Sequence, residues 1–215
     1  DGLKHIKVID AVVHFAGVLR FGTVVGLSGN EMDLVFKVNV LGVARVTRLF
    51  FPLFNRGQSG PPSRVIAVAS ELSLANIPTP YNSAYSASKV ALENLTSSLR
   101  VELGLCGVPV VTINPGAFAT DIIQSRPPPS QPNTVIGGVD LADLAIRGMD
   151  NYTHVHAKSP ALLAPTIYRA VHALRPRRRY TCNYSWEFLA MSVVPNVVME
   201  WVMLRGLALF RSRVQ

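Results

Sequence analysis

Cysteine is scarce in this chain of 215 residues, which contains only Cys106 and Cys182. Neither lies in a Cys-x-x-Cys pair or in a cluster with histidine, so the sequence predicts no disulfide framework and no metal site. Because the absence of a disulfide framework is typical of proteins in reducing compartments, we expect an intracellular location.

Motifs of nucleic-acid-binding domains are also missing, although the formal net charge is +8 at pH 7. Much of this charge lies in one short run that contains Arg175, Arg177, Arg178 and Arg179. A basic run next to apolar sequence favours anionic lipid over nucleic acid as a partner, although such a run is most often a solvated face. We therefore predict no nucleic-acid partner.

The chain lacks an uninterrupted apolar run of about 20 residues, which a membrane-spanning helix requires. Its most apolar stretch, residues 188–210, is interrupted by Pro195, Asn196, Glu200 and Arg205. We expect two helices, hinged at Pro195, that border the substrate site and associate peripherally with an internal membrane such as the endoplasmic reticulum. Otherwise the protein is expected in the cytoplasm, with these apolar faces covered by the sheet domain or by a second subunit of a homo-oligomer.

Nearly half of the residues, 49%, are apolar, which is enough for one sizeable core. In the first half of the chain, short runs rich in β-branched residues alternate with longer helical patterns. The predicted strands are residues 8–15, 64–69 and 108–114, and the predicted helices are 28–54, which opens on a capping-box spacing, and 84–103. This alternation predicts the α/β class, with a doubly wound parallel sheet and helices on both of its faces.

Small or polar residues follow each predicted strand. Ala16 and Gly17 end the first strand, Ser70 ends the second, and Pro115 and Gly116 stop the third. Because ligands bind at the carboxyl ends of parallel strands, we expect these positions to converge on one ligand-binding edge of the sheet.

The start of the second predicted helix carries a tyrosine–lysine pair, Tyr85 and Lys89. Residues four apart lie one turn apart on the same helix face. An ammonium group there favours the phenolate, whose unperturbed pKa is about 10, and makes proton transfer to a substrate oxygen feasible. Taken by itself, the pair is more typical of a solvated helix face than of a reactive site.

The amino-acid composition changes after Gly116, where proline and glycine become frequent. A loop of that composition is typical of a mobile lid over a substrate. The predicted elements here are a loop at residues 125–138, helices at 141–149 and 160–174, and an edge strand at 176–180. We divide the chain into a sheet domain at 1–182 and an apolar helical extension at 183–215.

Five motifs occur in the order that is found in the short-chain dehydrogenase/reductase family, and the chain resembles that family over about residues 9–180. The motifs are a strand that ends in Ala-Gly at 10–17, the helix segment 38–40 around Asn39, the strand and serine at 65–70, Tyr-Ser-Ala-Ser-Lys at 85–89, and Pro-Gly-x-x-x-Thr within 114–120. The arginine-rich segment, Trp186 and the apolar tail resemble the retinol/steroid branch of the family more loosely.

The resemblance implies a Rossmann-like fold and a catalytic set of Asn39, Ser70, Tyr85 and Lys89. In this set, Tyr85 is the general acid/base toward the substrate oxygen, and Lys89 lowers its pKa and holds the nicotinamide ribose. Ser70 hydrogen-bonds the substrate oxygen, and Asn39 supports a water that relays protons. The residues expected to contact NAD or NADP are Ala16, Gly17, Tyr85, Lys89, Pro115, Gly116, Phe118 and Thr120.

The chain departs from the family pattern at two places in the site. His14 and Phe15 stand where the family has two asparagines, which alters a polar contact near the cofactor. The spacing from Ser70 to the tyrosine is two residues longer than the family's, so Ser73 competes for the serine role. Tyr81 competes for the tyrosine role, but it has no lysine four residues later.

The family's Gly-rich turn, which holds a dinucleotide pyrophosphate at a helix N-terminus, is absent from this sequence. We therefore expect the chain to be a fragment that lacks the first three βα units of the sheet. Such a chain should bind NAD(P) weakly and expose the edge of its first strand.

Two functions fit these observations. The first is an NAD(P)-dependent oxidoreductase that interconverts an alcohol and a carbonyl on a small apolar substrate of the retinoid, steroid or lipid type. The second is a non-catalytic scaffold or inactive fragment that has lost dinucleotide binding. A nucleotide-sugar epimerase on the related extended fold fits less well, because a large sugar-binding domain would have to follow Thr120.

Overall fold

A four-stranded parallel sheet forms the centre of the protein. The computed structural model describes residues 6–57, 60–75, 77–124, 135–136 and 139–214. Within them the strand order is β1 (Ala11–His14), β2 (Arg64–Val68), β3 (Val110–Pro115) and β6 (Arg179–Cys182), with every neighbouring pair parallel. The predicted α/β class with a parallel sheet is therefore confirmed.

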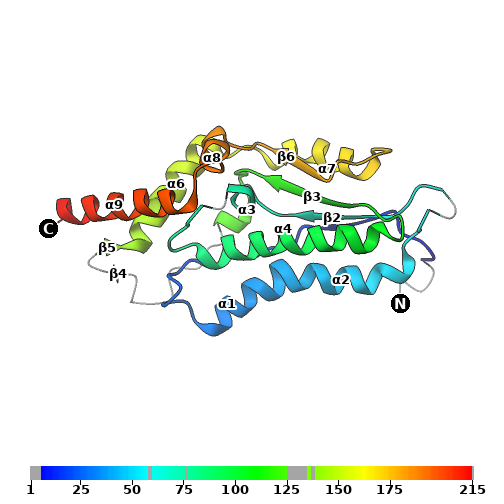
Figure 1. Ribbon diagram of the computed structural model, residues 1–215, viewed down its shortest axis with the longest axis horizontal. Helices are drawn as coiled ribbons and strands as arrows, with labels where there is room; N and C mark the ends of the chain where they lie inside the picture. Colours follow the sequence, from blue (N-terminus) through cyan, green and yellow to red (C-terminus); the bar gives the residue numbers. More distant parts are fainter. Residues whose placement is uncertain (1–5, 58–59, 76, 125–134, 137–138, 215) are drawn as a thin grey trace.

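The helices lie on both faces of this sheet. The long helix α4 (Ser83–Gly104) lies alongside α1 (Gly29–Phe36) and α2 (Gly42–Phe50) on one face, and α7 (Ala164–His172) lies on the other (Figure 1). The remaining elements are the helices η1 (Lys37–Leu41), η2 (Phe51–Leu53), α3 (Leu72–Ala75), α5 (Asp121–Gln124), α6 (Leu141–His156), η3 (Pro160–Leu163), α8 (Trp186–Met191) and α9 (Asn196–Val214), and the antiparallel pair β4 (Val135–Ile136) and β5 (Val139–Asp140).

The alternating directions of the β2 side chains explain how helices pack on both faces of the sheet. Side chains of successive strand residues point to opposite faces of a sheet. Ile66 packs with Ala170 of α7, whereas Ala67 packs with Val43 of α2 and Leu92 of α4. Because β2 is covered on both faces, its sequence is continuously apolar from Val65 to Val68, which is typical of a central parallel strand.

The first strand differs from its prediction. Residues 8–15 were expected to form a buried strand, but β1 comprises only Ala11–His14 and is half-buried throughout. Val8 and Phe15 on either side are exposed. The reason is that β1 is the outermost strand of the described sheet and pairs with β2 on one side only, so the predicted exposed strand edge is present among the described residues.

The helix predicted at 28–54 is present but interrupted. Ser28 and Glu31 form the predicted capping box, with the Ser28 side chain accepting from Glu31 N and the Glu31 side chain accepting from Ser28 N. One π-helical segment, Lys37–Leu41, separates α1 from α2. Such insertions are frequent at functional sites, and this one contains Asn39.

The elements after Gly116 also differ from their predicted bounds. The helix predicted at 141–149 continues to His156, and the one predicted at 160–174 consists of η3 and α7. The edge strand was expected at 176–180 but spans Arg179–Cys182, because the irregular segment before it is held by a side chain, with Arg177 N–H donating to Tyr180 Oη. Most of the predicted lid loop, residues 125–134 and 137–138, lies outside the described residues.

The apolar tail forms two helices on either side of Pro195, as predicted. α8 ends at Met191 and α9 begins at Asn196, and α9 extends away from the sheet at one end of the molecule (Figure 1). Among the described residues no helix is both long enough and apolar enough to cross a bilayer. The tail side chains were expected to be covered by the sheet domain, a second subunit or a membrane. The sheet domain leaves several of them exposed: Trp186, Leu189, Val193, Val197, Trp201 and Leu204.

Candidate functional site

Ser70 and Tyr85 meet at the carboxyl edge of the sheet. Ser70 follows β2, and Tyr85 lies in the first turn of α4, whose N-terminus reaches the same edge. Their side-chain hydroxyls are close enough for Ser70 to lower the pKa of Tyr85, and Ser70 Oγ accepts from Leu72 N at 3.3 Å. The two hydroxyls that the sequence assigns to one substrate oxygen are therefore adjacent.

Tyr85 is a protonated phenol in this arrangement. Burial raises its pKa to about 12, the hydrogen bond from Ser70 opposes this shift, and the nearby charge of Glu71 adds to it. The expected lowering by Lys89 is not among the causes, because the Lys89 ammonium lies over the tyrosine ring, 5.6 Å from its centroid, and not at its hydroxyl. Desolvation thus outweighs the lysine here.

The Lys89 ammonium is a buried cation with spare donors. Its side chain is only 4% exposed, and Nζ donates to Val68 O at 3.0 Å. Burial lowers its pKa to about 8. An ammonium has three protons, and among the described residues Val68 O is the one acceptor found for them. Burying unpaired donors is costly, so this group is suited to ligand acceptors such as ribose hydroxyls.

Asn39 connects three parts of the site. Its Oδ1 accepts from Val18 N at 2.8 Å, and its Nδ2 donates to Val18 O at 3.0 Å and to Ser88 Oγ at 2.9 Å. A Cβ on Gly17 would lie 3.6 Å from Asn39 Oδ1 and 3.7 Å from Lys89 Nζ. Asn39 is therefore not an exposed mid-helix polar residue: it fixes the turn after β1 against α4, beside the Lys89 ammonium.

Ser73 is held away from the Tyr85 hydroxyl by other partners. Its Oγ donates to Ser70 O at 2.5 Å and accepts from Asn114 Nδ2 at 2.8 Å. Asn114 also donates to Ser70 O and to Glu93 Oε2. The Ser73 hydroxyl is thus used to fix the Ser70 backbone, and Ser70 is the serine that contacts Tyr85.

Tyr81 is packed as a core residue. It is fully buried with a positive φ of 67°, and its ring stacks on Phe21 with centroids 6.2 Å apart. Its hydroxyl has no hydrogen-bond partner among the described residues, whereas that of Tyr85 interacts with Ser70, which lowers its pKa. The geometry favours Tyr85 over Tyr81 as the reactive tyrosine.

The expected cofactor residues reach the same edge with different exposure. Ala16 is exposed, Gly17 is half-buried beside Asn39 and Lys89, and Thr120 is half-buried. Phe118 is buried and bridges to Lys158. Among these, Gly17 lies beside the buried lysine that has free donors.

At Gly116 the small residue serves a contact within the chain. A Cβ there would lie 1.8 Å from Asn183 O, and Gly116 N donates to Cys182 O at 2.9 Å. The Pro115–Gly116 turn is thus in direct contact with the segment that follows β6.

His14, which departs from the family pattern, turns toward α2. Its Nε2 lies 3.1 Å from Thr47 Oγ1, and burial lowers its pKa to about 4, so the ring is neutral at physiological pH. Phe15 beside it is exposed at the strand end. Neither side chain supplies a charge to the site.

Glu71 was missed by sequence reasoning. It follows Ser70 directly, and only 4% of it is exposed. Burial raises the pKa of its carboxyl group, and the hydrogen bond from Tyr152 is the largest opposing effect. The one signal in the sequence was an acidic residue directly after the serine that ends a strand. It did not suffice, because the hydrogen-bond partners of Glu71 lie far away along the chain.

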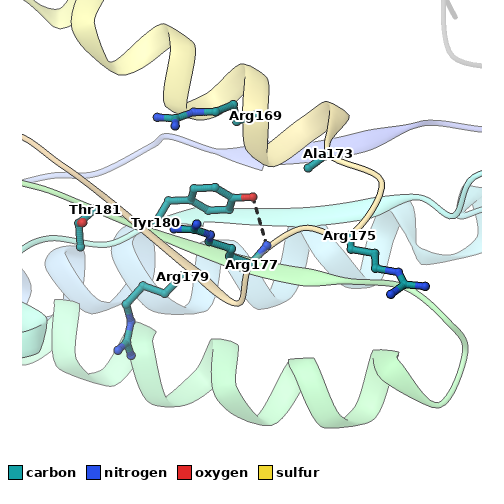
Figure 2. Close-up of a pocket in the computed structure, with 7 residues that line it drawn as sticks. All are labelled: Arg169, Ala173, Arg175, Arg177, Arg179, Tyr180 and Thr181. Carbon is teal, nitrogen blue, oxygen red and sulfur yellow. Dashed lines mark hydrogen bonds between the residues drawn. The ribbon is translucent and has the colours of Figure 1, made fainter.

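A separate pocket of about 430 Å³ lies at the opposite edge of the sheet, around the amino end of β6. It is lined by Arg169, Ala173, Arg175, Arg177, Arg179, Tyr180 and Thr181. Figure 2 shows Arg169 on α7 above Tyr180, and Arg179 directed away toward α4, where it pairs with Glu93. Arg175, Arg177 and Arg179 of the basic run line this pocket, which shares no residue with the Ser70–Tyr85 pair past the carboxyl end of β2.

The chain is similar to known oxidoreductases. It is 35% identical over 125 residues to an uncharacterized NAD-dependent oxidoreductase of Mycobacterium tuberculosis, covering 58% of this chain and 44% of that protein. It is 27% identical over 187 residues to retinol dehydrogenase 8 of Bos taurus, covering 82% of this chain and 57% of that protein. The chain thus spans about half the length of the curated relatives that it matches.

The fold comparison agrees. A short-chain dehydrogenase/reductase from Burkholderia phymatum, solved in complex with NAD, superposes with a TM-score of 0.69 at 24% identity, covering 88% of this chain and 66% of that one. The family model described as short chain dehydrogenase matches residues 2–130, which is more than half of the chain. With its parallel sheet and ordered motifs, this chain belongs to the short-chain dehydrogenase family.

Proposed function

We propose that this protein is an NAD(P)-dependent oxidoreductase that interconverts an alcohol and a carbonyl on an apolar substrate. The observation that carries the proposal is the Ser70–Tyr85 hydroxyl pair, with the buried Lys89 ammonium one helix turn away. Kinship with NAD-dependent relatives supports it. The alternative, a non-catalytic scaffold, gives no reason to bury a lysine with unpaired donors.

Each residue has a chemical role in this proposal. Tyr85 gives its proton to the carbonyl oxygen during reduction, or takes it from the alcohol during oxidation, while Ser70 holds the same oxygen. Asn39 keeps the turn after β1 beside Lys89 and supports a water that relays protons from Lys89. NAD or NADP, when bound, supplies or accepts the hydride. Lys89 would hold it, with Ala16, Gly17, Pro115, Gly116, Phe118 and Thr120 around it.

An apolar substrate is supported by two observations. Retinol dehydrogenase 8 is among the relatives, and the tail on the same side of the sheet carries many exposed apolar side chains. We test the activity by following NADH absorbance with all-trans-retinol as the probe. Turnover supports the oxidoreductase, whereas failure of the protein to bind NADH or NADPH at millimolar concentration would favour the scaffold.

Lys89 gives a test that separates binding from chemistry. Lys89→Ala removes the buried donors, so we expect about tenfold or greater weakening of nucleotide affinity together with a loss of turnover. Lys89→Arg restores a cation with a different shape, so it should recover affinity better than rate. Nucleotide titration and initial rates measure the two effects. Unchanged affinity in Lys89→Ala would limit the lysine to a structural role.

The division into a sheet domain at 1–182 and an extension at 183–215 is part of the proposal. We infer that the extension covers the apolar substrate and that a second copy of the chain or an internal membrane, such as the endoplasmic reticulum, covers its outer face. Burying one large apolar side chain is worth about 1.5–3 kcal/mol, so many exposed ones favour a cover.

Deletion and flotation test the role of the extension. Removing residues after Tyr184 should raise KM for retinol far more than KM for the nucleotide, because in this proposal the deleted helices border the substrate and not the nucleotide. The intact protein should float with phospholipid vesicles, and alkaline carbonate should release it, as expected for peripheral contact. If it never floats and runs as a dimer in gel filtration, the second copy provides the cover instead.

A further inference from the structure

Glu71 lies at the junction between the strand ends and the C-terminal half of the chain. Its N–H donates to Pro115 O at 2.9 Å, which fixes its backbone at the end of β3. Its carboxyl group is buried, and a buried carboxylate is stable only where donors surround it. The donors to the Glu71 carboxyl group show which segments of the chain this residue connects.

Both carboxyl oxygens accept hydrogen bonds from distant segments. Tyr152 of α6 donates its hydroxyl to Oε1 at 2.5 Å, and Ser185 donates its backbone N–H to Oε2 at 3.3 Å. Ser185 is also the N-cap of α8, where its Oγ accepts from Phe188 N. The Glu71 carboxyl group thus connects α6 and the start of α8 to the segment that directly follows Ser70.

The Tyr152 ring extends this junction. It packs edge-on against Phe188, with centroids 5.5 Å apart, and against His156 at 4.6 Å. His156 Nε2 lies 3.7 Å from Glu187 Oε1. The titratable groups that face Glu71 are therefore Tyr85 from α4, Tyr152 and His156 from α6, and Tyr184 before α8, while Glu187 acts on Tyr152.

The position of α6 matters to the site because this helix belongs to the same apolar cluster as Tyr85. Leu141, Ala142, Ala145 and Met149 of α6 share one apolar cluster with Leu19, Phe21, Tyr81 and Tyr85. The N-terminal half of α6 thus forms an apolar wall beside Tyr85. Its C-terminal half is fixed at Tyr152.

We propose that Glu71 is a positioning residue that fastens α6 and α8 beside the Ser70–Tyr85 pair and so sets the apolar wall of the substrate site. The proposal deepens the proposed function and rests on it for its kinetic consequences. Glu71 acts on the wall through Tyr152 and Ser185. Its charge also acts on Tyr85, since it helps to raise the pKa of that hydroxyl.

Amide hydrogen exchange tests the fastening without any need for activity. Tyr152→Phe removes one hydroxyl and keeps the ring, and Glu71→Gln keeps the shape and removes the charge. Hydrogen bonds to charged groups are strong enough that each variant should speed exchange in residues 152–157 and 185–191 by roughly tenfold or more. Exchange in β2 should not change. Tyr168→Phe, on an exposed α7 tyrosine, and Glu102→Gln, on an exposed α4 carboxylate, are the matched controls.

Kinetics with all-trans-retinol and NAD⁺ test the consequence for the site. Both variants should raise KM for retinol several-fold and leave KM for NAD⁺ within a factor of two. Only Glu71→Gln removes the negative charge near Tyr85, so only this variant should shift the rise of the oxidation rate to lower pH. A purely structural carboxylate would leave the pH profile in place.

The outcomes are distinguishable. Wild-type exchange rates in both variants would overturn the proposal, whatever the activity. Faster exchange with unchanged KM for retinol would also overturn it, because the wall would then not depend on Glu71. If the wild-type protein does not oxidise retinol, the proposed function fails on that substrate, and the exchange experiment still decides whether Glu71 fastens α6 and α8.

Discussion

Tyr85→Phe is expected to lower turnover by about 10²–10⁴-fold, the usual cost of losing a general acid–base group. The substitution removes the hydroxyl beside Ser70 and leaves the ring in its apolar cluster. Fold and nucleotide binding should therefore survive. Initial rates, with nucleotide titration in parallel, provide the measurement.

Tyr81→Phe is the matched control for this prediction. Its hydroxyl has no hydrogen-bond partner among the described residues, so its removal should leave turnover near the wild-type value. The reverse pattern, with Tyr81→Phe inactive and Tyr85→Phe active, would show that Tyr81 and not Tyr85 is the reactive tyrosine.

The pKa of Tyr85 also predicts a pH dependence. Alcohol oxidation needs the phenolate to accept a proton, and with a pKa of about 12 this form increases as pH rises above neutrality. The oxidation rate should therefore rise with pH, whereas carbonyl reduction, which uses the protonated form, should stay level. In Tyr85→Phe the residual oxidation rate should lose this rise.

Gly116→Ala is expected to be the most destabilising small substitution in the described part of the site. The new Cβ would lie 1.8 Å from Asn183 O and 2.8 Å from Asn183 C, and both are backbone atoms. Asn183 cannot easily retreat, because its Nδ2 donates to Ala117 O and His156 O and its φ is 52°.

We expect Gly116→Ala to cost about 3 kcal/mol or more, at the upper end of overpacking. For a chain of this size that corresponds to a fall in Tm of about 6–12 °C. Gly148→Ala is the control, because a Cβ there meets no atom within 4 Å and should be neutral or stabilise α6 by roughly 0.5–1 kcal/mol. Equal melting temperatures for the two variants would contradict the contact between Gly116 and Asn183.

Local patterns in the sequence determined the framework of this protein. The β-branched runs, the Ser28 capping box and the spacing of Tyr85 and Lys89 are each set by neighbours within one or two turns. Parallel pairing then follows from the strand–helix alternation, and with it the convergence of Gly17 and Ser70 on one edge. These features were predictable because periodicity and topology alone decide them.

Tertiary contacts decided the chemistry of the site. Ser70 and not Ser73 contacts Tyr85 because Asn114, 41 residues after Ser73, holds the Ser73 hydroxyl. Glu71 finds its partners 81 and 114 residues away, in Tyr152 and Ser185. The pKa of Tyr85 rises, although a lysine one turn away predicts a fall, because burial removes water from the phenolate and Lys89 Nζ faces the Val68 carbonyl. Desolvation and long-range hydrogen bonds depend on which segments meet in space, and the spacing of residues along the chain does not contain that information.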